Sequence, residues 1–264
     1  MTAAPARLLI VPAAGLGTRL GGAVPKALAM VAGKPMIQRV FELHRGRVAL
    51  AVAVVRPGME AGVEAVAHEA GIPVRCVRQE RPTGMLDAIL LAAGEVRRAD
   101  PASVWITWCD QVAVRAETLD ALERACADGE EPCVAFPTLV GPRPYIHFER
   151  DPAGRVAGLR QRREGDVMPE VGESDAGLFA LSRRAYLEHL AEFAAGVGAR
   201  GATGERNFLP FIPWLEARVP GAVRTFPCRE GMEALGVNTP EDLARVEAYL
   251  ASRSAAGGEA GCAP

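Results

Sequence analysis

Residues 7–26 read RLLIVPAAGLGTRLGGAVPK, and this stretch contains the pattern from which the fold can be inferred. Its first part, residues 7–14, is almost continuously apolar, which is typical of a parallel strand buried on both faces of a sheet. Gly15 and Gly17 follow directly, and glycines in that position can turn backbone N–H groups toward an anion. The stretch therefore predicts a buried strand that ends in an anion-binding loop.

Strand-like and helix-like segments alternate as far as residue 127. Apolar runs predict strands at residues 48–55, 73–78 and 103–109, and helical periodicity predicts helices at 35–43, 60–70, 86–96 and 117–127. This alternation favours a parallel sheet covered by helices. We therefore predict an α/β fold, with a Rossmann-like, mostly parallel sheet flanked by helices. Ligands bind such sheets beyond the carboxyl ends of the strands.

The pattern changes after residue 132, where short strand-like pieces follow one another as far as residue 182. They predict a small β-rich flap, at about residues 132–182, added to the main sheet. A helix is expected at residues 186–193. Near the C-terminus, Thr239, Pro240 and Asp242 have the spacing of a helix N-cap, first helical position and capping-box acid. Residues 1–251 are expected to form one domain, and residues 252–264 a disordered tail.

The composition is that of an ordinary globular enzyme or binding protein. The chain has 264 residues, of which 49% are hydrophobic, and a net charge of −2. No basic face for nucleic acid and no apolar run long enough to span a membrane is expected. The N-terminus lacks the order of regions found in signal peptides, which predicts a cytoplasmic protein. The six cysteines form no CxxC pair and are expected to be reduced thiols.

Lys26 and Lys34 are the only lysines, whereas the other 28 basic residues are arginines. An arginine-rich composition explains why lysine is scarce but not why both lysines lie within nine residues. Arg19 and Lys26 can flank a triphosphate, and a compact ammonium suits a crowded phosphate site better than a broad guanidinium does. Lys34 is expected at a solvated turn.

The segments AAGLGTRLGGAVPKAL (13–28) and AGKPMIQRV (32–40) resemble the opening signature of nucleotidyltransferases. These enzymes couple a nucleoside triphosphate (NTP) to a sugar 1-phosphate or a related acceptor. The nearest resemblance is to the uridyltransferase half of N-acetylglucosamine-1-phosphate uridyltransferases, and it extends from about residue 8 to residue 250. The resemblance implies nucleotide binding by Ala13, Ala14, Gly15, Gly17, Thr18, Gln79 and Gly84.

The resemblance also implies a catalytic set of Arg19, Lys26 and Asp110, with Mg²⁺ bound by Asp110 and Asn238. Asp110 follows a predicted strand, and Asn238 lies in a GVN tripeptide that matches the family. Carboxylate and amide oxygens are ligands that Mg²⁺ prefers. The sequence departs from the family pattern at Met85 and Asp87, and at Cys109, which replaces a glycine and is expected to be a small buried thiol.

The predicted flap is expected to hold the acceptor through Gly141, Gln161 and Asp175. Gln161 takes the place of a sugar-binding glutamate of the family, and Asp175 that of a sugar-binding asparagine. Exchanging an amide and a carboxylate changes which hydroxyl or acetamido groups can pair with the site. The resemblance therefore supports the type of reaction better than it supports N-acetylglucosamine as the acceptor.

The expected function is Mg²⁺-dependent transfer of a nucleotide from an NTP, with UTP favoured, to a sugar 1-phosphate, which yields an NDP-sugar and pyrophosphate. Gln79 favours uracil and is compatible with cytosine and thymine. One alternative is a cytidylyltransferase that acts on a non-sugar phosphate. The other is a regulatory module that binds nucleotide sugars without turnover. The sequence leaves the oligomeric state open.

Overall fold

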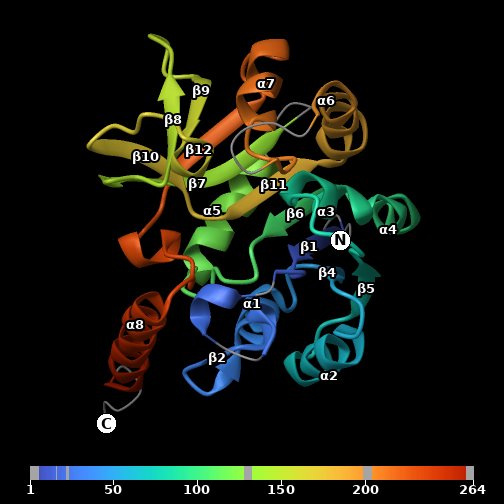
Figure 1. Ribbon diagram of the computed structural model, residues 1–264, viewed down its shortest axis with the longest axis vertical. Coiled ribbons are helices and arrows are strands. Elements are labelled where there is room, and N and C mark those ends of the chain that lie inside the picture. The colour runs from blue at the N-terminus through green and yellow to red at the C-terminus, as the bar shows by residue number, and fades with distance from the viewer. Residues whose placement is uncertain (1–5, 16, 22–23, 128–132, 199–203, 260–264) are drawn as a thin grey trace.

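The computed structural model describes residues 6–15, 17–21, 24–127, 133–198 and 204–259 (Figure 1). The strands are β1 (Arg7–Pro12), β2 (Met30–Val31), β3 (Lys34–Pro35), β4 (Leu50–Val55), β5 (Val74–Arg78), β6 (Ser103–Thr107), β7 (Val134–Pro142), β8 (Ile146–Arg150), β9 (Val156–Gln161), β10 (Val171–Asp175), β11 (Leu178–Ser182) and β12 (Val223–Pro227). The α-helices are α1 (Met36–His44), α2 (Glu60–Ala70), α3 (Met85–Leu91), α4 (Ala93–Ala99), α5 (Ala116–Ala127), α6 (Leu190–Gly196), α7 (Phe211–Arg218) and α8 (Pro240–Glu259). The shorter helices are η1 (Thr18–Leu20), η2 (Lys26–Leu28), η3 (Arg162–Glu164), η4 (Ala185–His189) and η5 (Gly231–Ala234).

The predicted α/β fold is confirmed, with four parallel strands that form one side of an eight-stranded sheet. These strands lie in the order β5-β4-β1-β6, and Leu8 of β1 is paired with both Leu50 of β4 and Val104 of β6. Because parallel strands end at the same edge of a sheet, the segments that follow β1, β5 and β6 meet there. These segments carry the glycine loop, Gln79 and Asp110.

Two apolar cores, one on each face of the sheet, fill the space between sheet and helices. Leu9 and Val11 of β1 belong to one core, and Leu8 and Ile10 belong to the other, as expected for a strand whose side chains alternate between faces. The first core includes side chains from α1, α2, α5 and α8, and the second includes side chains from α3, α4, α6 and α7. Figure 1 shows α1, α2 and α8 below the sheet and α6 and α7 above it.

Most of the predicted flap at residues 132–182 joins the main sheet, as the expectation of a β-rich addition to that sheet implies. β11 is antiparallel to β6, and β7 pairs along one edge with both β10 and β11 and with β12 in parallel. Asp175 lies opposite Thr138 and Ala180 opposite Ala135, so β10 and β11 run end to end with a two-residue bulge between them. Of the described strands between residues 133 and 182, only β8 and β9 form a sheet of their own, a hairpin beside β10.

The boundaries of several elements differ from the predictions. The helix expected at residues 86–96 is divided into α3 and α4 at Ala92, and Gly94, a weak helix former, lies in the first turn of α4. The helix expected at residues 186–193 begins as the π-helical turn η4 before it continues as α6. α8 continues to Glu259, beyond the point where the tail was expected to begin, and residues 260–264 lie outside the described residues.

Candidate active site

A cleft of about 1240 Å³ opens along the edge of the sheet where the parallel strands end. It is large enough for a nucleotide together with a second small ligand. Of the predicted site residues, those that line the cleft are Ala14, Gly15, Gly17, Thr18, Arg19, Lys26, Gln79, Gly84, Asp110, Gly141, Gln161, Asp175 and Asn238. Ala13 is the exception, because its side chain is buried in the core and its backbone N–H donates to Val54 O over 2.7 Å.

Lys26, Asp110 and Asn238 meet at one end of the cleft, which we call the loop end (Gly15, Gly17, Arg19, Lys26, Asp110 and Asn238). Lys26 Nζ forms an ion pair with Asp110 Oδ2 and donates to Asn238 Oδ1 over 2.7 Å. Arg19 Nη2 donates to the same Asn238 oxygen over 3.2 Å. Two cations and two oxygen ligands from distant parts of the chain therefore share one small volume.

Asp110 and Asn238 are held by the backbone around them. Val237 N–H donates to Asp110 O over 3.2 Å, which ties the segment before α8 to the segment after β6. The predicted capping box at the start of α8 is confirmed, since Asp242 N–H donates to Thr239 Oγ1 and the Asp242 carboxylate accepts from Thr239 N–H. The same carboxylate accepts from Asn238 N–H over 3.1 Å, so the helix cap also positions Asn238.

Gly17 allows the glycine loop to pack directly against Lys26. Its φ of +68° lies in the left-handed region, and a Cβ at this position would lie 2.8 Å from Lys26 Cβ. A larger residue would therefore displace the lysine. Arg19 follows in η1 and is exposed to solvent, so its guanidinium is available to a ligand in the cleft.

The oxygens at the loop end fit a hard divalent cation. Asp110 Oδ2 and Asn238 Oδ1 both contact the Lys26 ammonium, which shows that the two oxygens converge on a position that accepts positive charge. Among the described residues, no group of three His, Cys, Asp or Glu side chains forms a metal cluster. One carboxylate and one amide suit Mg²⁺, which usually keeps waters and substrate phosphates as its remaining ligands.

Gln79 and Gly84 follow β5, which lies on the opposite side of β1 and its glycine loop from β6 and Asp110. Gln79 is 7% exposed, and its Nε2 is 3.5 Å from Gly84 O, at the limit of a hydrogen bond. Gly84 has a φ of +122°, and a Cβ there would lie 2.5 Å from the backbone nitrogen of Arg206. The structure thus gives Gly84 a packing reason, the close approach of Arg206, in addition to its predicted role at the base.

The departure from the family pattern at Asp87 is explained by the same arginine. Arg206 Nη1 lies 2.5 Å from Asp87 Oδ1, and Arg206 Nε donates to Val197 O over 3.1 Å. Arg206 N–H also donates to Thr83 O, and Leu86 N–H donates to Arg206 O, each over 3.0 Å. These contacts fasten the segment that contains Arg206 across the start of α3.

Cys109 is a buried thiol that lines the cleft beside Asp110. Burial and the neighbouring carboxylate of Asp110 raise the pKa of this thiol to about 12, so it is protonated at neutral pH. Cys109 is therefore unsuited to act as a nucleophile. Five of the six cysteines lie in the described residues, and none of these five forms a disulfide bond.

Gly141, Gln161 and Asp175 lie near the β8–β9 hairpin, at what we call the hairpin end of the cleft (these three residues with Asn207). Gln161 Oε1 accepts a hydrogen bond from Asn207 Nδ2. Asp175 Oδ1 accepts from Gly177 N–H over 2.7 Å. Removal of the carboxyl group from water raises the pKa of Asp175 to about 6. Asp175 therefore changes its charge near neutral pH.

Several residues that line the cleft were not predicted from the sequence as site residues. Trp108 and Gln111, which flank Cys109 and Asp110, and Arg206 and Asn207, which precede α7, all line the cleft. The first pair could have been found from its place after a strand that carries a predicted metal ligand. Arg206 and Asn207 carry no local signal, because their contacts are with Asp87 and Gln161. Glu205 lies beside them and pairs with Arg163 over 2.7 Å.

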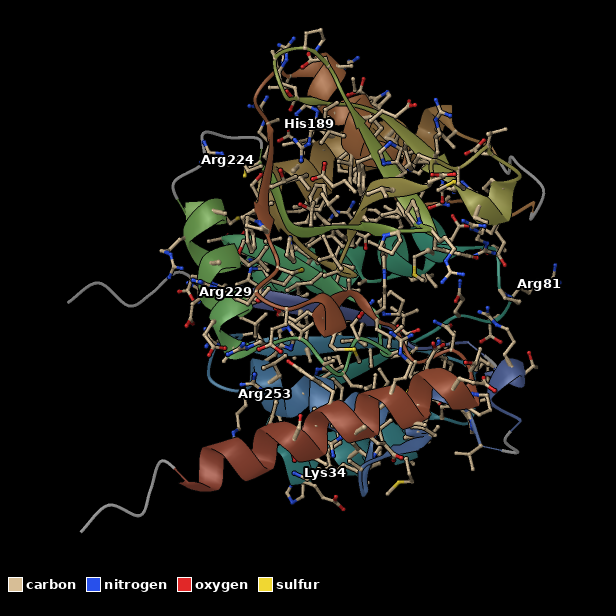
Figure 2. The ribbon with its side chains drawn as sticks, turned by 90° about the vertical axis from the view of Figure 1, so that its left-hand side faces the viewer. Lys34, Arg81, His189, Arg224, Arg229 and Arg253 are labelled. Atoms are coloured by element: carbon tan, nitrogen blue, oxygen red, sulfur yellow. The ribbon has the colours of Figure 1, made fainter. Side chains whose placement is uncertain are left out.

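Lys34 lies outside the cleft. Its Nζ is 2.8 Å from both carboxylate oxygens of Glu42, on the surface of α1. Figure 2 shows Lys34 at the lower edge of the molecule. The contrast between the two lysines supports the expectation that only Lys26 belongs to a site.

Comparison with known proteins places the chain among nucleotidyltransferases. Residues 9–207 match a family model described as a MobA-like NTP transferase domain. The chain is 32% identical over 252 residues to the bifunctional protein GlmU of Anaeromyxobacter dehalogenans, which covers 93% of this chain and 50% of the relative. It is 32% identical over 257 residues to GlmU of Azorhizobium caulinodans and 31% identical over 247 residues to GlmU of Thermus thermophilus, covering 93% and 92% of this chain and 53% and 52% of the relatives. The chain thus spans about half the length of these relatives.

None of the described helices has the length and apolar composition required to cross a membrane.

Proposed function

Since the chain belongs to the MobA-like NTP transferase domain family, we propose that it is a Mg²⁺-dependent enzyme that transfers a nucleotide from an NTP, with UTP favoured, to a sugar 1-phosphate. One observation carries the proposal: Lys26 meets Asp110 and Asn238 at a single point of the cleft. Asp110 lies 84 positions after Lys26 in the chain, and Asn238 lies 212 positions after it. A shared position for positive charge beside a glycine loop suits the phosphates of an NTP.

The proposed reaction needs binding and charge neutralisation rather than a nucleophilic side chain. An oxygen of the acceptor phosphate attacks the α-phosphorus of the NTP, and the bond from that phosphorus to the β-phosphate oxygen breaks, which releases pyrophosphate. Arg19 and Lys26 hold the triphosphate and stabilise the negative charge of the leaving pyrophosphate. The acceptor phosphate is already ionised at neutral pH, so no general base is required. Mg²⁺ held by Asp110 and Asn238 would neutralise the charge that develops on the reacting phosphates.

We expect the two substrates to bind at different ends of the cleft. The loop end would bind the triphosphate, and Gln79 beside it would hydrogen-bond to the base, since an amide both donates and accepts. The hairpin end would bind the acceptor through Gly141, Gln161 and Asp175. The proposal of a sugar phosphate rests on the resemblance to sugar nucleotidyltransferases and on the polar groups at this end. GlmU, the name shared by the relatives, is consistent with it.

The test is pyrophosphate release in Mg²⁺ buffer, with UTP, CTP, dTTP, GTP and ATP each combined with a panel of sugar 1-phosphates. We expect release to require one particular pair and to stop when EDTA removes the metal. Release with CTP and a non-sugar phosphate would replace the sugar acceptor with the alternative class. Nucleotide-sugar binding without any release would contradict the enzymatic proposal and favour a binding module.

A further inference from the structure

Gln111 has a buried amide oxygen without a partner at the junction of the two ends of the cleft. The residue follows Asp110 directly, lines the cleft and is 7% exposed. Among the described residues, none hydrogen-bonds to its Oε1. A buried carbonyl oxygen without a donor destabilises the folded protein, so a donor from outside the chain is the natural partner.

The bulge between β10 and β11 fixes the position of this side chain. A Cβ on Gly177 would lie 2.6 Å from Gln111 Cγ and Nε2, and 2.5 Å from Trp108 Cδ1. Gly177 thus allows Gln111 and Trp108 to pack against the bulge. Asp175, at the other side of the bulge, accepts the N–H of Gly177. Gln111 is therefore close to both the predicted metal ligand Asp110 and the predicted acceptor contact Asp175.

The amide of Gln111 can turn without moving the rest of the side chain. The terminal torsion of glutamine joins an sp³ carbon to an sp² carbon and has a broad, roughly two-fold energy profile. Rotation about it exchanges the oxygen and the nitrogen, so that a ligand donor in the cleft can satisfy the oxygen.

We infer that Gln111 is a specificity-determining residue, whose amide oxygen accepts a hydrogen bond from a hydroxyl group of the acceptor. The inference deepens the proposed function and rests on it for the identity of the acceptor as a sugar phosphate. A site that offers a buried hydrogen-bonding group discriminates strongly against a ligand without the matching group, because the group of the site then stays unpaired.

The test is calorimetric binding by the full chain of UTP, UDP-glucose and each monodeoxy analogue of UDP-glucose. Gln111→Met keeps the length of the side chain and removes its amide. We expect the variant to bind UDP-glucose at least 10-fold more weakly than the wild type and to bind UTP equally well. One monodeoxy analogue should bind the wild type and the variant with the same affinity, which would identify the hydroxyl group. The matched control is Gln38→Met, because Gln38 is 8% exposed and lies in α1, outside the cleft.

A merely structural role for Gln111 predicts a different result. It predicts a lower melting temperature for Gln111→Met, together with equal weakening of UTP and UDP-glucose, and that result would overturn the inference. Unchanged affinity for every ligand, or a wild type that binds none of the UDP-sugars, would overturn it as well. Selective loss of UDP-glucose binding in a protein that releases no pyrophosphate would support the inference while contradicting the proposed enzymatic function, so the two failures are distinguishable.

Discussion

The loop end and the hairpin end of the cleft are built in different ways. At the loop end, each main residue is placed by the local structure beside it: Lys26 by the glycine loop, Asp110 by the end of β6 and Asn238 by the cap of α8. At the hairpin end, Gln161 is placed by a contact between distant segments, since it is paired with Asn207, 46 positions away. Local structure leaves a motif in the sequence, whereas long-range packing leaves none.

This difference has a consequence for function. If the loop end contains the chemistry common to nucleotidyltransferases, substitutions there should abolish turnover with every substrate. If the hairpin end selects the acceptor, substitutions there should change which acceptor is used and how the protein responds to pH.

Asp110→Ala should reduce pyrophosphate release by about 10²–10³-fold or more, because it removes a proposed ligand of the metal and the ion-pair partner of Lys26. Circular dichroism and the melting temperature should remain close to those of the wild type. Asp120→Ala is the control, since Asp120 pairs with Arg47 on the surface and is 47% exposed. Turnover near the wild-type rate in Asp110→Ala would remove this residue from the mechanism.

Lys26→Arg should reduce turnover by about 10–100-fold, because the broader guanidinium cannot occupy the small space between Asp110, Asn238 and Gly17. Steady-state kinetics with varied NTP would measure the effect. Lys34→Arg is the matched control on the only other lysine, and its surface pair with Glu42 should tolerate arginine with no change in rate. Equal rates for the two variants would show that the ammonium of Lys26 has no special role.

Gly177→Ala should lower the free energy of unfolding by about 2 kcal/mol, because alanine is strained at a φ of +65° and its Cβ would collide with Trp108 and Gln111. Acceptor affinity should fall more than NTP affinity, since the bulge belongs to the hairpin end. Gly141→Ala is the control for stability, because a Cβ there meets open space. Urea unfolding would measure the difference, and two equally stable variants would refute the packing role of Gly177.

Asp175→Asn should change the pH dependence of stability. The native carboxyl has a pKa of about 6, above its ordinary value of 3.8, so the folded state binds this proton more tightly than the unfolded state does. The wild type therefore loses stability at this site as the pH rises from about 4 to about 6. An asparagine at this position has no such loss, so if the two proteins are equally stable at pH 4, the variant should be more stable by about 2 kcal/mol at pH 7.5.

Asp151→Asn is the control for this measurement. Hydrogen bonds from the backbone and side chain of Arg155 lower the pKa of Asp151, so its contribution to stability has the opposite sign and is lost as the pH falls through that lowered pKa. Chemical unfolding of the wild type and both variants at a series of pH values from below the ordinary Asp151 pKa of 3.8 up to pH 8 would show the two trends. Parallel curves for the wild type and Asp175→Asn would contradict the raised pKa of Asp175.

The sequence predicted the parallel part of the fold well because each of its elements carries its own signal. The apolar runs predicted β1, β4, β5 and β6, and Thr239 with Asp242 predicted the start of α8. The sequence predicted short strands at residues 132–182 but not their pairing, because a short apolar pattern marks a strand without specifying its partner strand. The division of a predicted helix at Ala92 likewise depends on packing.

The candidate site shows the same difference between features with a local sequence signal and features that depend on long-range packing. The sequence predicted an anion-binding role for the glycine loop and Lys26 from the chemistry of these residues, and the resemblance to nucleotidyltransferases predicted Asp110 and Asn238 as metal ligands. Only the tertiary structure brought Asn207 to Gln161, Arg206 to Asp87 and Gly177 to Gln111. The physical reason is that these contacts depend on distances between segments far apart in the chain, which no spacing along the sequence contains.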